Sequence, residues 1–152
     1  TEEDAEYTKK NVYITTALYG VINAYEAIHE HRLDFLQNVK IKDSSLKNLW
    51  REDYDRSVEN DEVIISLLSS EFEEVFSKTI REKFIKITFM EEKNGDLKTH
   101  STISKKARGK FLSEIIKRKI TNIREVETIK FDGFEYKFEL STENNLAFVA
   151  KR

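Results

Sequence analysis

The sequence predicts an α+β or mixed α/β fold, in which a mixed sheet with a β-hairpin is flanked by helices. Two observations predict the strands: a continuous apolar run over residues 63–68, and two β-rich runs, 84–91 and 97–103, that flank an Asn-Gly pair. The helices are predicted by apolar residues that recur at helical spacing over 45–58 and 106–119. Strands interspersed with amphipathic helices indicate a sheet that is covered by helices.

The first half of the chain is predicted to hold a strand followed by helices. Residues 12–18 are rich in β-forming side chains and predict a strand that stops at Tyr19-Gly20. Residues 21–29 predict a short helix, because their apolar residues fall on one side at helical spacing. Ser44 or Ser45 is expected to cap the next helix, which runs to about Val58. Its expected buried residues are Leu46, Leu49, Trp50 and Tyr54.

The middle of the chain is predicted to combine strands with one helix. The apolar run over 63–68 is bounded by polar residues, which is typical of a strand covered on both faces in the interior of a sheet. Ser70 and Glu73 match a capping box, which predicts a helix from Ser70 to about Lys78. The Asn94-Gly95 pair favours a tight turn, since glycine takes a positive φ without a Cβ penalty, so the flanking runs are predicted to form a hairpin.

The last third of the chain is predicted to hold two helices and a second antiparallel pair of strands. A helix is expected over about 106–119, and a shorter one, capped by its first threonine, over about 121–128. The β-rich runs 134–140 and 146–150 are separated by a short polar stretch and are expected to pair.

The composition indicates one globular domain. The 152 residues are 39% hydrophobic and 36% charged, with no proline and four glycines. No linker divides the chain, so we expect a single domain over residues 1–152. The absence of cysteine excludes disulfides, thiolate metal ligands and cysteine nucleophiles. No apolar run approaches the ~20 residues that span a bilayer, so we expect no membrane partner, and the absence of cysteine fits a reducing cytosol.

The charges are unevenly distributed, although the net charge is only −2. Eight basic residues and one acidic residue lie between Lys98 and Lys119, whereas acidic residues dominate between Glu52 and Glu74. The two segments could pair with each other or face different partners.

A cluster of cations lies at the predicted start of the 106–119 helix. Lysine and arginine there oppose the helix macrodipole, so we expect a negative group to compensate them. Free amides at a helix start, together with these cations, suit a phosphate or a carboxylate, and Gly109 would allow a ligand to approach closely. The candidate nucleic-acid or anion-binding residues are Lys105, Lys106, Arg108, Gly109 and Lys110.

Arg108 also has a purely structural interpretation. At about 100° per residue it projects close to the centre of the apolar stripe of its helix, so we expect it to be largely buried. It could then form a buried ion pair with Glu71 or Asp34, while the neighbouring lysines are solvated. The sequence leaves both interpretations open.

A second group of polar residues follows the apolar run over 63–68. Open α/β sheets bind ligands beyond the carboxyl ends of their strands, which favours a site at Ser69, Ser70 and Glu71. A helix cap at Ser70 and a first-turn acid at Glu71 explain the same residues without a ligand. The candidates for a cleft shared with the basic segment are Tyr19, His31, Arg32, Trp50, Ser69, Ser70 and Glu71.

Residues 29–34 bring two histidines and two carboxylates together, so metal binding has to be considered. The two histidines are two residues apart, which is poor helical ligand spacing, and His100 is remote in the sequence. We therefore expect no metal site and no cofactor. Asp34 is expected to pair with Arg32 or with the basic helix.

Several segments occur in the order and approximate spacing of a known family. They are Ala17-Leu18-Tyr19-Gly20, His31-Arg32-Leu33-Asp34-Phe35, Leu49-Trp50, Leu67-Leu68-Ser69-Ser70-Glu71-Phe72, Lys105-Lys106-Ala107-Arg108-Gly109, and residues 131–138 around Gly133. In this pattern the chain resembles the YaaA peroxide stress family. The resemblance implies a bacterial, cytosolic protein of mixed α/β fold that helps cells survive hydrogen peroxide by limiting unincorporated iron. It also implies a positively charged cleft, for which DNA binding through a helix-hairpin-helix-like element has been proposed.

The chain departs from the family pattern in two places. Family members begin with a strand that ends in a Pro- and Lys-containing motif, followed by helices, and this chain starts downstream of them, so we expect it to be N-terminally truncated. The family usually has Arg-Pro soon after the Tyr-Gly turn, where this chain has Asn23-Ala24, so no role is carried over from that arginine.

Three functional hypotheses follow. The leading one is binding of DNA or another phosphate-containing ligand in a basic cleft, without catalysis. The alternative is an enzyme for a small anionic substrate, with Arg108 and Lys105 as the anion clamp and Glu71 or His31 as acid or base. The third is direct iron binding by the side chains of residues 29–34 with Glu71. A deep closed pocket would favour the enzyme, and an open basic groove would favour nucleic acid.

Overall fold

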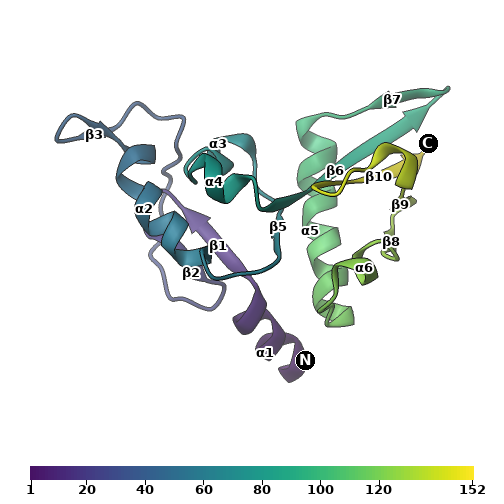
Figure 1. Ribbon diagram of the computed structural model, residues 1–152, viewed down its shortest axis with the longest axis horizontal. Helices are drawn as coiled ribbons and strands as arrows, with labels where there is room; N and C mark the ends of the chain where they lie inside the picture. The colour runs from purple at the N-terminus through teal and green to yellow at the C-terminus, as the bar shows by residue number, and fades with distance from the viewer. The chain divides into compact units, whose positions relative to one another are not determined.

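The computed structural model describes all 152 residues and confirms the mixed α/β class (Figure 1). Contacts within the chain divide it into two compact units. The N-terminal unit comprises Thr1–Ile64 and Leu68–Phe84, and the C-terminal unit comprises Ile65–Leu67 and Ile85–Arg152. The assignment of a single domain to residues 1–152 stays a prediction.

The N-terminal unit begins with a helix and a hairpin: α1 (Glu2–Asn11), β1 (Tyr13–Thr16) and β2 (Gly20–Asn23). The helix predicted over 21–29 is wrong, because β2 pairs antiparallel with β1 instead. Gly20 makes this hairpin possible, since its φ of 79° is left-handed and a Cβ there would lie 2.7 Å from the Trp50 ring. Backbone pairing with β1 therefore determines the structure of these residues, although their apolar residues have helical spacing.

The next elements are two short strands, β3 (Lys40–Ile41) and β4 (Ser44–Ser45), and the helix α2 (Leu46–Val58). The predicted cap is confirmed, because the Ser45 hydroxyl accepts a hydrogen bond from the Asn48 amide at 3.3 Å. The expected burial is confirmed for Leu46 and Tyr54. It is wrong for Leu49, which is exposed, and Trp50 is half-buried.

Two single-turn helices follow, α3 (Ser70–Glu73) and α4 (Lys78–Arg81). The single helix predicted from Ser70 to about Lys78 is wrong in two respects. The cap position is Ser69, without a side-chain hydrogen bond, so no capping box forms. Ser77 then starts α4, because its hydroxyl accepts from the Ile80 amide at 3.4 Å and its own amide donates to Asp55 Oδ1 at 2.9 Å.

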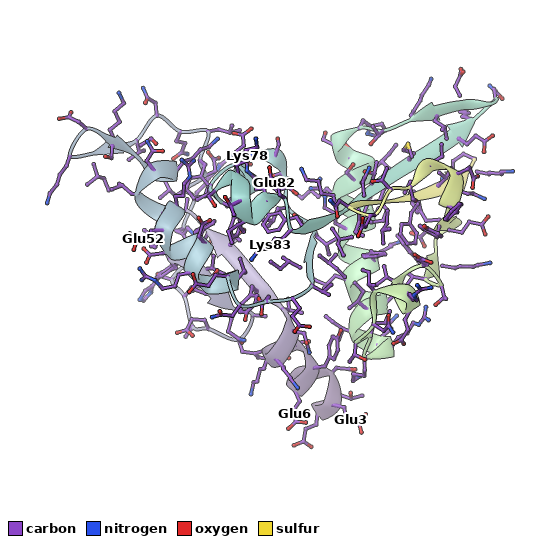
Figure 2. All side chains as sticks on the ribbon, viewed as in Figure 1. Glu3, Glu6, Glu52, Lys78, Glu82 and Lys83 are labelled. Carbon is purple, nitrogen blue, oxygen red and sulfur yellow. The ribbon has the colours of Figure 1, made fainter.

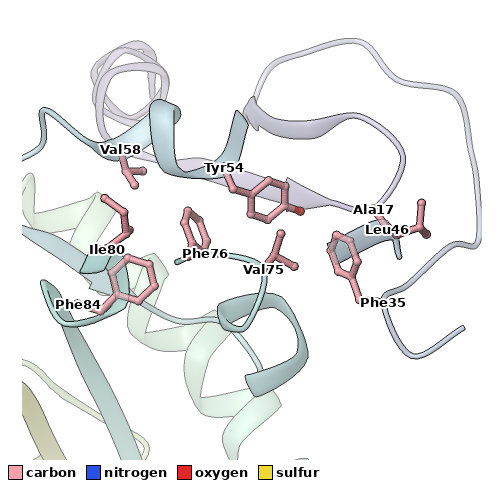
Figure 3. Packing of buried hydrophobic residues seen from close by; sticks show 9 residues of the cluster. All are labelled: Ala17, Phe35, Leu46, Tyr54, Val58, Val75, Phe76, Ile80 and Phe84. Carbon is pink, nitrogen blue, oxygen red and sulfur yellow. The ribbon is translucent and has the colours of Figure 1, made fainter. Parts of the chain in front are cut away.

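The core of the N-terminal unit surrounds Tyr54 of α2, which is fully buried (Figure 3). Its ring lies against Phe76 and Phe35, with centroid distances of 5.0 and 6.0 Å. Its hydroxyl donates to the Thr16 carbonyl at 2.6 Å, and burial raises the pKa of this hydroxyl above its ordinary value. The core therefore ties α2 to the β1–β2 hairpin.

The C-terminal unit is built on a mixed sheet with strand order β5-β6-β10-β9-β8, and β7 also pairs with β6. The strands are β5 (Ile64–Ser66), β6 (Phe84–Lys93), β7 (Asp96–Lys98), β8 (Lys130–Phe131), β9 (Phe134–Tyr136) and β10 (Asn145–Lys151). The central pair, β6 and β10, is parallel. The antiparallel pairing predicted for the last third of the chain is confirmed for β9 and β10, but its first strand ends at Tyr136, and residues 138–140 form a 3₁₀ turn instead. The run over 63–68 is wrongly predicted as an interior strand, because only three of its residues form β5, at the edge.

The predicted hairpin is confirmed, since Lys93 pairs with Asp96 across a turn in which Asn94 and Gly95 have φ of 54° and 84°. Its second strand is shorter than predicted, because β7 ends at Lys98. The remaining residues of that run belong to the helix α5 (Ser101–Arg118), whose start lies five residues before the predicted one.

The other helical segments of this unit are α6 (Ile123–Val126) and the single 3₁₀ turn η1 (Phe138–Leu140). The cap of α6 is Asn122, whose side chain accepts from the Arg124 amide at 2.9 Å, so the cap predicted at Thr121 is wrong by one residue. None of the helices has the length and apolar character that crossing a membrane requires.

Candidate functional site

The helix α5 carries all the predicted anion-binding residues and packs one face on the sheet. Its buried residues are Ala107, Phe111 and Ile115. The Phe111 ring lies 5.5 Å from that of Phe89 on β6 and 5.1 Å from that of Phe148 on β10. These aromatic contacts fix the rotation of α5, and with it the direction of every other side chain on the helix.

The early start of α5 changes the basis of the predicted site. The cap is His100, whose ring accepts from the Ile103 amide at 3.4 Å, so Lys105 and Lys106 lie in the second turn. The prediction that these cations surround free amides at a helix start is therefore wrong, because amides in the second turn are bonded within the helix. An anion at these residues would be held by side chains.

The face of α5 opposite the sheet, called the outer face below, is open to solvent. It carries a shallow depression that is lined by Ser101, Thr102, Lys105, Lys106, Gly109, Lys110 and Ser113. These residues combine three ammonium groups with three hydroxyls around one glycine. Such a lining offers hydrogen-bond donors and positive charge, which suits phosphate oxygens.

The three lysines of the outer face differ in their partners. Lys105 and Lys106 are exposed and form no ion pair, whereas the Lys110 ammonium forms an ion pair with Asp132 Oδ2. Farther along α5, Lys117 pairs with Glu114 at 3.2 Å. Two lysines are therefore available for an anion without breaking an existing ion pair.

Arg108 lies beside the outer face and differs from its prediction. It is half-buried rather than largely buried, because the apolar stripe is centred on Ala107, Phe111 and Ile115 and Arg108 lies at its edge. It forms no hydrogen bond or ion pair with any residue of the C-terminal unit. Its predicted contact with Glu71, which belongs to the N-terminal unit, stays a prediction.

Gly109 has no packing role in the structure. It is exposed, and a Cβ built on it would meet no other atom within 4 Å. A glycine inside a helix costs about 1 kcal/mol relative to alanine. The fold does not require glycine here, and the close approach of a ligand at this position stays a prediction.

The two units carry opposite net charges. The N-terminal unit has 11 basic and 18 acidic residues, a balance of −7, and the C-terminal unit has 15 basic and 10 acidic residues, a balance of +5. Figure 2 shows Glu3 and Glu6 on α1 and Glu52 on α2 among the side chains that project outward from the acidic unit. The predicted separation of basic and acidic segments therefore extends to whole units.

The structure places some of the cleft candidates together in the N-terminal unit. The Tyr19 ring meets the His31 ring edge-on at 5.4 Å, and the Tyr19 hydroxyl accepts from the His29 amide at 3.1 Å. Trp50 has a structural role beside them, since its indole N–H donates to the Ala17 carbonyl at 2.8 Å. Arg32 is exposed and contributes to neither contact.

The serines and the carboxylate after β5 form a small polar group. The Ser69 hydroxyl donates to Glu71 Oε1 at 3.4 Å, and Glu71 Oε2 is buried without a hydrogen-bond partner. Ser70 is the first residue of α3, as a helix start alone would explain. A cleft shared by this group and the outer face would join residues of two units, and it stays a prediction.

The side chains of residues 29–34 do not form a metal site with Glu71. No group of three or more histidine or carboxylate residues in the structure is arranged to hold a metal ion. Asp34 has another role, because its Oδ1 accepts from the amides of Leu36 and Gln37 at 2.9 and 3.1 Å. It caps a turn, and the predicted pairing with Arg32 is not seen.

Asp132 is the residue that the sequence analysis missed. It precedes Gly133 in the turn between β8 and β9, where the two residues have φ of 46° and 79°. An Asp-Gly pair between β-rich residues is itself a hairpin signal. That signal could have placed the turn, but not the contact with Lys110, which is 22 residues away in the sequence.

Comparison with known proteins gives one consistent family. The family model described as peroxide stress protein YaaA matches residues 1–140. The chain is 49% identical to the UPF0246 protein of Streptococcus gordonii over 151 residues, which cover 99% of this chain and 62% of that protein. It is likewise 49% identical to the UPF0246 proteins of Streptococcus sanguinis and Streptococcus uberis, over 98% of this chain and 62% and 61% of theirs. The chain thus spans about 62% of the length of these relatives.

Proposed function

The chain belongs to the peroxide stress protein YaaA family, and from that premise we propose that it binds nucleic acid, or another phosphate-containing ligand, through the outer face of α5. Lys105 and Lys106 would contact phosphates, with the hydroxyls of the same face as further donors. The observation that carries the proposal is this pair of exposed lysines without acidic partners on a face open to solvent.

The charge of the C-terminal unit supports the same proposal. A balance of +5 attracts a polyanion, and the strongest contribution comes from α5 and the residues around it. Each lysine that neutralises a phosphate releases a condensed counterion, so binding of this kind weakens steeply as salt increases. Salt dependence is therefore the property that an experiment should measure.

Binding explains the outer face better than catalysis does. A site for a small anionic substrate encloses its ligand and excludes water, whereas this depression is shallow and open. Its lining consists of lysines, hydroxyls and a glycine, and it provides no carboxylate or imidazole to act as a base. We therefore place the enzyme hypothesis second.

We place this binding in the bacterial cytoplasm, within a response to peroxide stress that limits unincorporated iron. Membership of the family supports the stress role, and the resemblance described above implies the role in iron limitation. We assign the role to anion binding rather than to direct metal binding, because the lysines of α5 are the side chains best placed for a ligand. We extend the same proposal, phosphate binding within a peroxide stress response, to the longer relatives.

The experiment measures duplex DNA binding by fluorescence anisotropy across a salt series. The double variant Lys105→Ala/Lys106→Ala is compared with the native chain and with Lys93→Ala, which removes an exposed lysine at the hairpin turn, away from α5. Circular dichroism confirms that each variant is folded. Anisotropy with a free polyphosphate in place of DNA separates nucleic acid from other phosphate ligands.

The double variant should bind more weakly at every DNA sequence. The slope of log Kobs against log salt should fall in magnitude by about 0.9 for each lost phosphate contact, or about 1.8 for the pair. Lys93→Ala should leave the slope close to the native value. Native affinity and slope in the folded double variant would overturn the proposal.

A further inference from the structure

The ion pair between Lys110 and Asp132 sets one lysine of the outer face apart from the others. Lys110 lies one turn after Lys106 on α5, and the Asp132 carboxylate reaches it from the turn between β8 and β9. Figure 1 shows β8 and β9 on one side of α5, so the carboxylate comes from a neighbouring element of the same unit. Lys105 and Lys106 have no such counterion.

The backbone at Asp132 is held by Arg152. The Arg152 guanidinium donates to the Asp132 carbonyl at 2.8 Å and to Glu91 Oε1 at 2.9 Å. The same group lies over the Phe134 ring, 5.4 Å from its centroid. Three contacts of Arg152 therefore hold the backbone of the turn, so that pairing with Lys110 costs the entropy of the two side chains alone.

A fixed carboxylate beside a lysine changes what that lysine can bind. A phosphate that approaches Lys110 meets the negative charge of Asp132 at the same place, and it has to displace an existing ion pair. At Lys105 and Lys106 neither obstacle exists. The ion pair is exposed, since the two side chains are 57% and 47% accessible, so its strength is modest and it can be altered by one substitution.

We propose that Asp132 is a positioning residue that withholds Lys110 from phosphate, so that the outer face offers two phosphate contacts instead of three. This inference rests on the proposed function of α5. It identifies Asp132 as the residue that limits the number of ion contacts and therefore the affinity. Neutralising Asp132 should add one contact.

The first test needs no DNA and measures the reactivity of each lysine. The native chain and Asp132→Asn are treated with an amine-acetylating reagent, and the rates at Lys110, Lys105 and Lys106 are read by peptide mass spectrometry. Asparagine tolerates a positive φ, so the turn is retained. Lys110 should react about two- to fivefold more slowly than the other two in the native chain, which is the usual strength of an exposed ion pair. The difference should disappear in Asp132→Asn.

The second test measures duplex DNA binding across salt. Asp132→Asn should steepen the slope of log Kobs against log salt by about 0.9, and Lys110→Ala should leave it at the native value. The double variant Asp132→Asn/Lys110→Ala should have the same slope as Lys110→Ala. Glu143→Gln removes an equal charge from an exposed loop of the same unit and should leave the slope unchanged.

The outcomes separate this inference from the function on which it rests. Equal reactivity of the three lysines in the native chain, an unchanged slope in Asp132→Asn, or a reduced slope in Lys110→Ala would overturn the inference alone. Absence of DNA and polyphosphate binding by every variant at low salt would overturn the proposed function, and the role of Asp132 with it.

Discussion

Replacing Gly109 with alanine tests whether that glycine serves the fold or a ligand. Gly109 is exposed in the interior of α5, and the added methyl group would meet nothing within 4 Å. Glycine costs a helix interior about 0.8–1.0 kcal/mol relative to alanine. We therefore expect Gly109→Ala to raise the free energy of unfolding of the C-terminal unit by about 1 kcal/mol, measured by urea denaturation.

Gly95→Ala is the matched control, because it adds the same methyl group at another open position. Nothing lies within 4 Å of a Cβ at Gly95 either, but its φ is +84°. A left-handed conformation costs a residue with a side chain roughly 1–2 kcal/mol. The two substitutions should therefore change the free energy of unfolding in opposite directions, although neither creates a steric clash.

The effect of Gly109→Ala and Gly95→Ala on DNA binding is the second part of this prediction. If the glycine allows a phosphate backbone to approach the helix, Gly109→Ala should weaken duplex DNA binding while stabilising the fold, and Gly95→Ala should bind like the native chain. A loss of stability in Gly109→Ala would refute the description of α5 as a regular, solvent-exposed helix at this residue. Unchanged DNA affinity would refute the close approach.

Two further predictions concern the N-terminal unit. Tyr54→Phe leaves the buried Thr16 carbonyl without its donor, so it should lower the free energy of unfolding in urea by about 1–3 kcal/mol; an unchanged midpoint would contradict the hydrogen bond. The hydrogen bond from Lys47 lowers the pKa of Glu74 below its ordinary 4.5, so the carboxylate contributes stability above that pH and the contribution is lost as pH falls through the lowered pKa. Glu74→Gln should therefore make the acid dependence of unfolding shallower below about pH 4.5, and identical acid titrations of the two proteins would argue against it.

The sequence by itself determined the features that depend on neighbouring residues. The Asn94-Gly95 turn follows from the freedom of glycine at positive φ, and the cap at Ser45 follows from a hydroxyl placed before the first turn of a helix. The family followed from motifs of which Lys-Lys-Ala-Arg-Gly is the most specific, and the family model confirms it. The turn and the cap are each contained within a few consecutive residues, and the family is identified by several such short motifs in a fixed order.

The start of α5 depends on how far β7 pairs along β6. Residues 97–103 have strand propensity, but β10 pairs along one edge of β6 and β5 occupies part of the other. β7 pairs only with Glu91 to Lys93, the strand ends at Lys98, and the residues that follow satisfy their backbone groups in a helix. Local secondary-structure propensity does not predict backbone pairing with strands that are distant in the sequence.

In the candidate site, too, some features follow from the sequence and others only from the tertiary structure. The lysines and the glycine of the outer face are identified by the sequence, because their residue types carry the charge and the conformational cost. Which of them are free was decided by the tertiary structure, since Lys110 meets a carboxylate that lies 22 residues away and Arg108 lies at the edge of the buried stripe. The physical reason is that ion pairs and burial depend on which elements pack together, and β8, β9 and α5 meet only when the sheet has formed.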